Sequence, residues 1–83
     1  MYLHLGQEVV VRFSDIVGIF DLEKATLSKH TKDFLAKATH EHRVVTVSYE
    51  MPKSFIVTVQ NSECIVYISQ ISTATLKKRA GLR

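Results

Sequence analysis

The sequence predicts an α+β fold, in which a small mixed, largely antiparallel sheet of five to six strands is combined with one internal helix and a short basic C-terminal helix. Two observations predict this class. Most apolar residues fall in runs of strand length, and only one internal stretch has the period of an amphipathic helix. The 83 residues include three glycines and one proline, and no linker or repeat divides them. We therefore expect residues 1–83 to form a single domain.

The expected strands are short apolar runs bounded by turn-forming residues. Gly6 ends the first run, residues 14–15 (Ser-Asp) interrupt the chain after the second, and Gly18 indicates a bulge or a close approach in the third. Residues 60–63, Gln-Asn-Ser-Glu, suit the turn of a hairpin. The six runs are Tyr2–Leu5, Glu8–Phe13, Ile16–Phe20, Val44–Tyr49, Ser54–Val59 and Cys64–Ser69.

The internal helix is expected at Ser28–His40, with Ser28 or Thr26 as its N-cap. Its lysines lie away from a single apolar stripe, as in a helix that covers a core with one side. The stripe consists of Leu27, Phe34, Leu35 and Ala38.

The C-terminal helix has the clearest local signals in the chain. Ser72 can cap a helix that begins at Thr73, while Ile71 and Leu76 have the spacing of a hydrophobic staple. Gly81 lies where a C-cap glycine belongs. The final turn of this helix then carries three cations, Lys77, Lys78 and Arg79.

The net charge of +3 is concentrated in this last segment. Residues 76–83 hold four of the eleven basic side chains and no acidic one, so residues 1–75 carry 7 − 8 = −1 and the tail carries +4. A positive patch on an otherwise balanced domain is typical of a polyanion partner, most often nucleic acid. The alternative is a solvated helix end, because cations there offset the helix dipole by about 0.3–1 kcal/mol each.

Several strands carry apolar side chains on both faces, as in Val9-Val10-Val11 and Phe55-Ile56-Val57. One internal helix and one short terminal helix cover roughly one side of such a sheet, which leaves apolar surface for another subunit. We therefore expect a homo-oligomer. The alternative is a small barrel that shelters both sets of side chains internally.

Catalytic and metal-binding patterns are poor. Two histidines in His40-Glu41-His42 fall short of the three or four ligands of a zinc site, and Cys64 has no evident base beside it. The carboxylates of Asp15, Asp21 and Glu23 have no diagnostic spacing for acid–base work. Phosphate-binding glycine loops, nucleophile elbows and dinucleotide motifs are absent from the sequence. We expect no enzymatic activity and no cofactor, metal or small-molecule substrate.

The sequence also predicts a cytoplasmic protein without a membrane segment. A single cysteine, Cys64, excludes an internal disulfide and fits a reducing compartment. The N-terminus has neither a basic start nor a long apolar core, and no stretch approaches the roughly 18 apolar residues of a membrane span.

Motifs along nearly the whole chain resemble a known family. They are His4-Leu5-Gly6, the run from Ser14 to Asp21 (SDIVGIFD), the run from Pro52 to Val59 (PKSFIVTV) and the run from Ile68 to Arg79 (ISQISTATLKKR). In order and spacing they are similar to the bacterial extracellular matrix regulatory protein family (RemA/RemB), RemB branch. The resemblance implies a cytoplasmic regulator that assembles into rings and binds DNA upstream of biofilm matrix genes to activate transcription.

The RemA branch places adjacent arginines in the connection before the strand Ser54–Val59, and this chain departs from that pattern. It has Tyr49-Glu50-Met51-Pro52 there, and Lys53 is the one cation close by. No arginine is therefore carried over, and the candidate contacts with double-stranded DNA follow from charge alone. They are Lys53, Lys77, Lys78, Arg79 and Arg83, with Arg43 behind them.

Two other functions compete with duplex binding. The first is an oligomeric protein-interaction scaffold whose basic tail binds an acidic protein surface. The second is a binder of single-stranded nucleic acid, which needs exposed aromatic side chains on a sheet face. The available tyrosines are Tyr2, Tyr49 and Tyr67.

Overall fold

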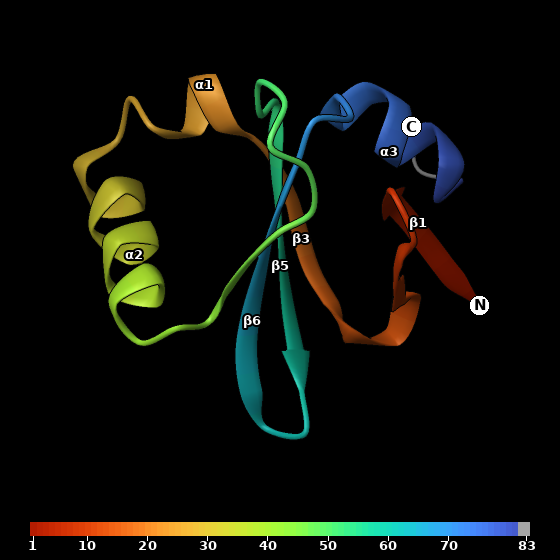
Figure 1. The fold of residues 1–83 in the computed structure, drawn as a ribbon, viewed down its shortest axis with the longest axis horizontal. Helices are drawn as coiled ribbons and strands as arrows, with labels where there is room; N and C mark the ends of the chain where they lie inside the picture. The colour runs from red at the N-terminus through yellow and green to blue at the C-terminus, as the bar shows by residue number, and fades with distance from the viewer. Residues whose placement is uncertain (82–83) are drawn as a thin grey trace.

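The computed structural model describes residues 1–81 and confirms the mixed α+β class (Figure 1). Within these residues, six strands form two sheets and three α-helices accompany them. The elements are β1 (Tyr2–Gly6), β2 (Val9–Arg12), the 3-10 turn η1 (Phe13–Asp15), β3 (Ile16–Asp21), α1 (Leu22–Ala25), α2 (Lys29–His40), β4 (Val44–Thr46), β5 (Ser54–Gln60), β6 (Glu63–Ser69) and α3 (Thr73–Arg79).

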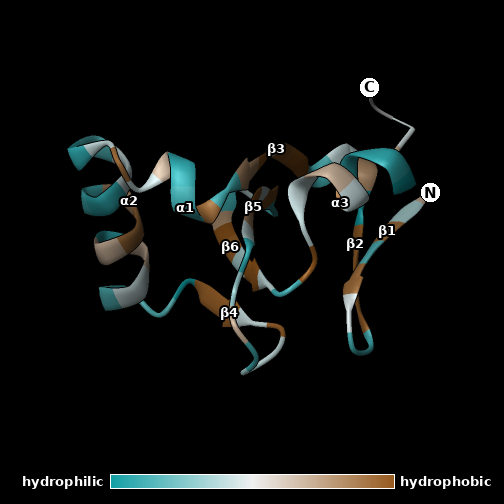
Figure 2. Cartoon of the chain, turned by 90° about the horizontal axis from the view of Figure 1, so that it is seen from above, coloured by the Kyte–Doolittle hydropathy of each residue, from teal (hydrophilic) through white to brown (hydrophobic). Residues whose placement is uncertain are grey.

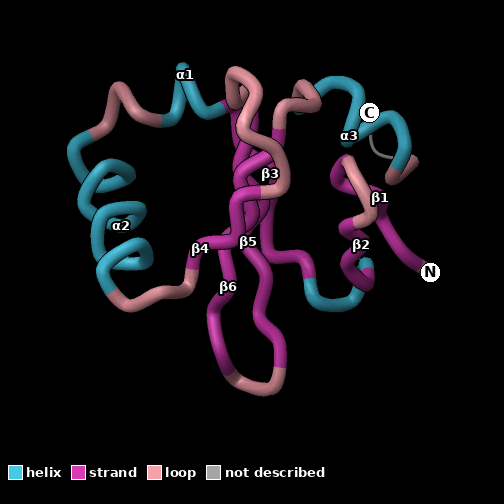
Figure 3. Tube along the Cα trace, in the orientation of Figure 1, coloured by secondary structure: helices cyan, strands magenta, loops and turns pink. Residues whose placement is uncertain are grey.

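The four-stranded sheet has the order β3-β5-β6-β4 and lies between two layers. The β3–β5 and β5–β6 pairs are antiparallel, and β4 runs parallel to β6. Figure 1 shows the sheet nearly edge-on, with α2 on one side and α3 with the β1–β2 hairpin on the other. The tube in Figure 3 shows the loop from β4 to β5 reaching the end of the molecule where α1 and α3 lie.

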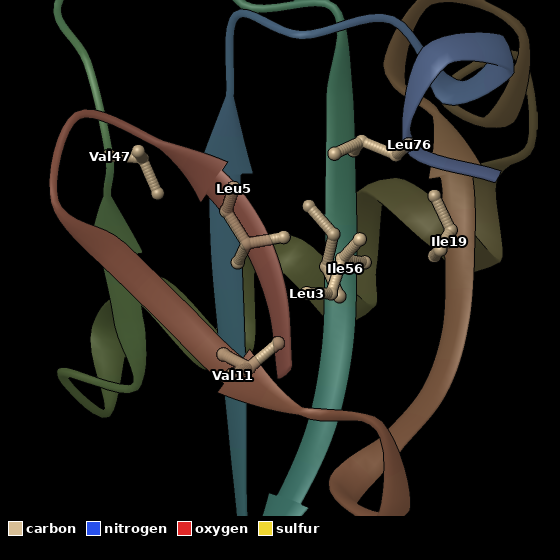
Figure 4. Packing of buried hydrophobic residues seen from close by; sticks show 7 residues of the cluster. All are labelled: Leu3, Leu5, Val11, Ile19, Val47, Ile56 and Leu76. Carbon is tan, nitrogen blue, oxygen red and sulfur yellow. The ribbon is translucent and has the colours of Figure 1, made fainter. Parts of the chain in front are cut away.

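The core has two parts, one on each face of the sheet. Figure 4 shows the larger part, in which Leu3 and Leu5 of the hairpin and Leu76 of α3 surround Ile56 of β5. The smaller part joins Ala38 of α2 to strands β5 and β6. Successive strand residues point to opposite faces, so strands buried on both sides must be apolar at consecutive positions. This accounts for the brown strands between the more hydrophilic helices in Figure 2.

The six strands form two separate sheets, whereas the sequence predicted one sheet of five to six strands. The β1–β2 hairpin forms its own two-stranded sheet instead of joining one sheet of five to six strands. The chain leaves β2 through the 3-10 turn η1, which changes its direction before β3 begins. The barrel alternative is wrong, because the four-stranded sheet is open and ends at β3 and β4.

Two boundaries also differ from the sequence prediction. Strand β4 ends at Thr46 instead of Tyr49. The chain bends at Val47, whose amide still donates to the Ile68 carbonyl of β6 at 2.9 Å, and it continues to Tyr49, which is 97% exposed. Helix α1 was not predicted, and Asp21 caps it by accepting a 2.9 Å hydrogen bond from the Lys24 amide. Four residues are too few to give a helical period, so only the cap could have indicated this turn.

Other local predictions are confirmed. The β3–β5 ladder shifts register between Ile16 and Gly18, and a Cβ at Gly18 would lie 2.6 Å from the Phe20 ring. Asn61 and Ser62 both have positive φ, as a tight hairpin turn between β5 and β6 requires.

Two expectations for α2 are wrong. Ser28 lies at the N-cap position but its side chain makes no capping hydrogen bond, and Leu27, which precedes the helix, is 85% exposed instead of part of the buried stripe.

Candidate nucleic-acid interface

Helix α3 presents the predicted cations on a well-anchored helix. Leu76 is fully buried against the sheet, and Ile71 packs beside the same cluster, as the predicted staple requires. The helix ends with Gly81 in the left-handed region, at φ 77°, and its amide donates to the Lys78 carbonyl at 3.1 Å. Both ends of α3 are therefore defined by the residues that the sequence singled out.

The N-cap of α3 gives a direct test of this anchoring. The Ser72 hydroxyl oxygen accepts a 3.2 Å hydrogen bond from the Thr75 amide. Replacing Ser72 by alanine should lower the free energy of unfolding by about 1 kcal/mol, because the amide loses its acceptor. Urea denaturation measures this loss. Ser72→Asp keeps an N-cap acceptor and should retain most of the stability; equal losses in both variants would contradict the capping role.

The side chains of Lys77, Lys78 and Arg79 are exposed on the last turn of α3. Within residues 1–81, none of the three forms a salt bridge, and the Arg79 guanidinium makes one long contact of 3.4 Å with the His4 carbonyl. We call these three residues the α3 cluster. With no acid in the helix, its positive charge is not compensated locally.

Lys53 lies near the other end of α3. Its amide donates to the Ser69 carbonyl at 2.9 Å, and its own carbonyl accepts from the Leu22 amide at 3.0 Å. Its side chain is exposed beside a hollow that Asp21 and Glu23 also line. Neither carboxylate forms a salt bridge with Lys53 among residues 1–81. The first four residues of α3, Thr73–Leu76, about 6 Å of helix, precede the α3 cluster.

The structure places Arg43 away from the other candidates, between α2 and β4. Its guanidinium contacts the Glu41 carboxylate at 2.8 Å and donates to the Cys64 carbonyl at 3.0 Å, and its side chain is 15% exposed. The hydrogen bond with Glu41 raises the pKa of Arg43 above its ordinary value. These contacts give Arg43 a structural role in joining α2 to β6, so we remove it from the interface. Arg83 lies outside the described residues.

Helix α2 carries a second group of exposed cations that were not among the candidates. Lys29, Lys32 and Lys37 are all exposed, and only Lys29 approaches an acid, Asp33, at 4.0 Å. Their spacing in a helix was visible in the sequence, but there they looked like the solvated side of an amphipathic helix. They lie in the layer opposite α3 (Figure 1).

The three tyrosines do not form a common stacking platform. Tyr2 is exposed on β1, Tyr49 is exposed in the β4–β5 loop, and Tyr67 is partly buried on β6, where its hydroxyl accepts a 2.9 Å hydrogen bond from Gln60. Stacking of successive bases needs aromatic rings that share one surface. The three rings lie on three separate segments, β1, the β4–β5 loop and β6.

The residues considered for metal or nucleophilic chemistry do not gather either. Within residues 1–81, no group of three or more His, Cys, Asp or Glu side chains could hold a metal ion. Cys64 is partly buried and packs against the smaller core part. No helix in the same range is long and apolar enough to cross a membrane.

Comparisons with known proteins identify the family of this chain. Residues 2–80 match the model of the RemA-like family, described as extracellular matrix regulatory protein A-like. The chain belongs to the RemA-like family. It is 50% identical over 80 residues to extracellular matrix regulatory protein B of Bacillus subtilis (strain 168), which covers 96% of this chain and 90% of that protein. The resemblance found in the sequence motifs is thereby confirmed for nearly the whole RemA-like chain.

Proposed function

We propose that this RemA-like protein is a bacterial, cytoplasmic regulator of extracellular-matrix genes in biofilms that binds double-stranded DNA as a ring-like homo-oligomer. Its family membership and the name of its Bacillus subtilis relative support the regulatory role. One structural observation supports DNA as the partner. The α3 cluster exposes three cations on a helix held by a fully buried leucine, with no acidic side chain in that helix.

The α3 cluster binds phosphate oxygens and releases the counterions condensed on the duplex. Such contacts position the protein but carry no direct sequence information, so specificity comes from DNA shape and curvature. One copy offers only a few cations. An oligomer repeats the cluster along its surface, and each further contact then forms at a high effective concentration, which raises the overall affinity without new chemistry.

The test compares two variants that each remove three positive charges. Lys77→Ala/Lys78→Ala/Arg79→Ala removes the α3 cluster, and Lys29→Ala/Lys32→Ala/Lys37→Ala removes the exposed lysines of α2. Fluorescence anisotropy with a labelled duplex is measured over a series of salt concentrations. The α3 variant should lose at least about tenfold in affinity, and its log–log salt slope should fall by roughly 0.9 for each phosphate group that the bound protein no longer neutralises. The α2 variant should keep most of the affinity and most of the salt slope of the unmodified protein.

Circular dichroism and thermal melting establish that both variants remain folded. Equal losses of affinity in the two variants would mean that net charge alone drives binding, which would remove the α3 cluster from the interface. Failure of the unmodified protein to bind any duplex at low salt, while it still assembles, would favour the protein-interaction scaffold instead.

A further inference from the structure

The four-stranded sheet ends in two unprotected edges, one at β3 and one at β4. Natural proteins usually protect an exposed edge with charged side chains or proline, because its free amides and carbonyls pair readily with another strand. Residues Ile16–Phe20 of β3 and Val44–Thr46 of β4 contain neither. The one charged residue of these two strands is Asp21 at the end of β3, and its carboxylate caps α1. Among residues 1–81, no further strand pairs with the outer side of either edge. The natural occupant of such an edge is a strand.

The β3 edge also has an apolar hollow on each face of the sheet. One hollow, of about 360 Å³, lies between β3 and α3 and includes Phe13 and Ala80. The other, of about 290 Å³, lies between β3 and α2 and includes Phe34. Val17 lines both hollows and is 66% exposed, since the bulge at this position turns it out of the regular ladder.

The strand directions show how a second copy fits this edge. Strands β3 and β6 are both antiparallel to β5, and β4 is parallel to β6, so β3 and β4 point the same way. If a neighbouring copy is rotated about an axis parallel to the strands, its β4 lies parallel to β3 of the first copy. The α2 face of one sheet then continues as the α2 face of the next, and the α3 face does the same. The lengths agree, because three uncharged residues of β3, Gly18–Phe20, follow the bulge before Asp21, and β4 also has three residues.

The side chains agree with this pairing. Val45 is 39% exposed and lies opposite Tyr67, which packs in the larger core part on the α3 face of the sheet. A neighbour's Val45 therefore lies on the same face as the hollow between β3 and α3. Apolar surface meets apolar surface, and neither Ile16–Phe20 nor Val44–Thr46 brings a like charge into the contact.

We propose that the β3 edge binds the β4 edge of a second copy, in a head-to-tail contact that extends the sheet from one subunit to the next. This inference rests on the proposed homo-oligomer and specifies its interface. A contact between two different surfaces of one chain repeats around a closed ring, whereas a two-fold contact ends at a dimer. Lys77 lines the hollow beside β3, so the interface and the α3 cluster adjoin.

The decisive experiment blocks each edge separately. Val17→Asp places a charge at the β3 edge, and Val45→Asp places one at the β4 edge. Light scattering without DNA should give an assembly for the unmodified protein and the single-chain mass for each variant. Mixing the two variants should yield a complex of two chains, because one unmodified β3 edge and one unmodified β4 edge remain. Leu27→Asp, at an 85% exposed loop position, is the control and should assemble normally.

Several outcomes would overturn this interface. If Val17→Asp alone prevented assembly and Val45→Asp did not, the contact would be a two-fold pairing of β3 edges. If the folded variants both assembled normally, or if their mixture stayed single-chain, the edges would not join as proposed. Should a variant fail to fold, Val17→Cys and Val45→Cys in a Cys64→Ala background replace it, and a short thiol cross-linker should join the two only when they are mixed.

The interface and the DNA proposal fail in different ways. The assembly state is measured in the absence of DNA, so loss of duplex binding in the α3 variant leaves that result unchanged. Conversely, a single-chain Val17→Asp protein that still binds a duplex weakly would retain the α3 contact while it loses the gain from multivalency.

Discussion

Replacing Leu76 by alanine is expected to lower the free energy of unfolding by about 2–5 kcal/mol. Leu76 is fully buried and packs with Ile19 and Ile56, so the truncation loses apolar burial and leaves a cavity between α3 and the sheet. A total stability of about 5–15 kcal/mol is usual for a domain, so this is a large part of it. Urea denaturation followed by circular dichroism measures the change.

The same substitution should also weaken duplex binding. A helix of seven residues does not persist alone in water, so α3 depends on Leu76 to hold its cations in place. Leu27→Ala provides the control, because this leucine is exposed and its loss should change stability by no more than about 0.5 kcal/mol. Similar destabilisation by both substitutions would show that the buried contact of α3 does not carry the effect.

Replacing Ser69 by alanine is expected to cost about 2–4 kcal/mol of unfolding free energy, because it leaves two backbone groups without partners. The buried Ser69 hydroxyl donates to the Leu5 carbonyl at 2.7 Å and accepts from the Ile71 amide at 3.0 Å. It therefore joins β1, β6 and the segment that leads into α3. Thermal and urea unfolding measure the loss.

Two other serines provide comparisons for the loss of unfolding free energy expected in Ser69→Ala. Ser54 is equally buried but its hydroxyl makes one hydrogen bond, to the Ile71 carbonyl at 2.7 Å, so Ser54→Ala should cost about half as much. Ser14 is exposed in η1, and Ser14→Ala should be nearly neutral. If the losses for Ser69 and Ser54 were the same, the number of hydrogen bonds would not determine the cost.

Local signals predicted the elements whose ends are defined by their own residues. Helix α3 begins at the cap of Ser72 and ends before Gly81, and the hairpin turn adopts the positive φ values expected of Asn61 and Ser62. Here the capping oxygen and the amide it binds lie within one turn of each other. Long-range contacts set the other boundaries. Strand β4 ends where the chain bends at Val47, and the side chain of Val47 packs in a core that includes Leu5 of β1, far away in the sequence.

The candidate site also combines features that follow from local sequence with features that depend on long-range contacts. The exposure of Lys77 and Lys78 follows from the helical period, because Leu76 takes the buried side and the next two residues turn away from it. Arg79 follows Leu76 by three residues and returns toward that side, so only the structure shows that it is exposed, beside the His4 carbonyl. Arg43 was chosen for its charge, but Cys64, 21 residues away, supplies the carbonyl that holds it. A count of charges does not identify such a partner, so only the folded chain distinguishes a structural cation from an available one.

The sequence by itself determined the fold class, the internal helix, the capped C-terminal helix and the concentration of positive charge on it. These features depend on residue type and spacing over a few turns or strand repeats. Only the tertiary structure decided that the hairpin stands apart from the main sheet, that Arg43 is held by a strand, and that β3 and β4 form the two edges. Those properties arise from packing between distant segments, because burial and strand order depend on which surfaces meet.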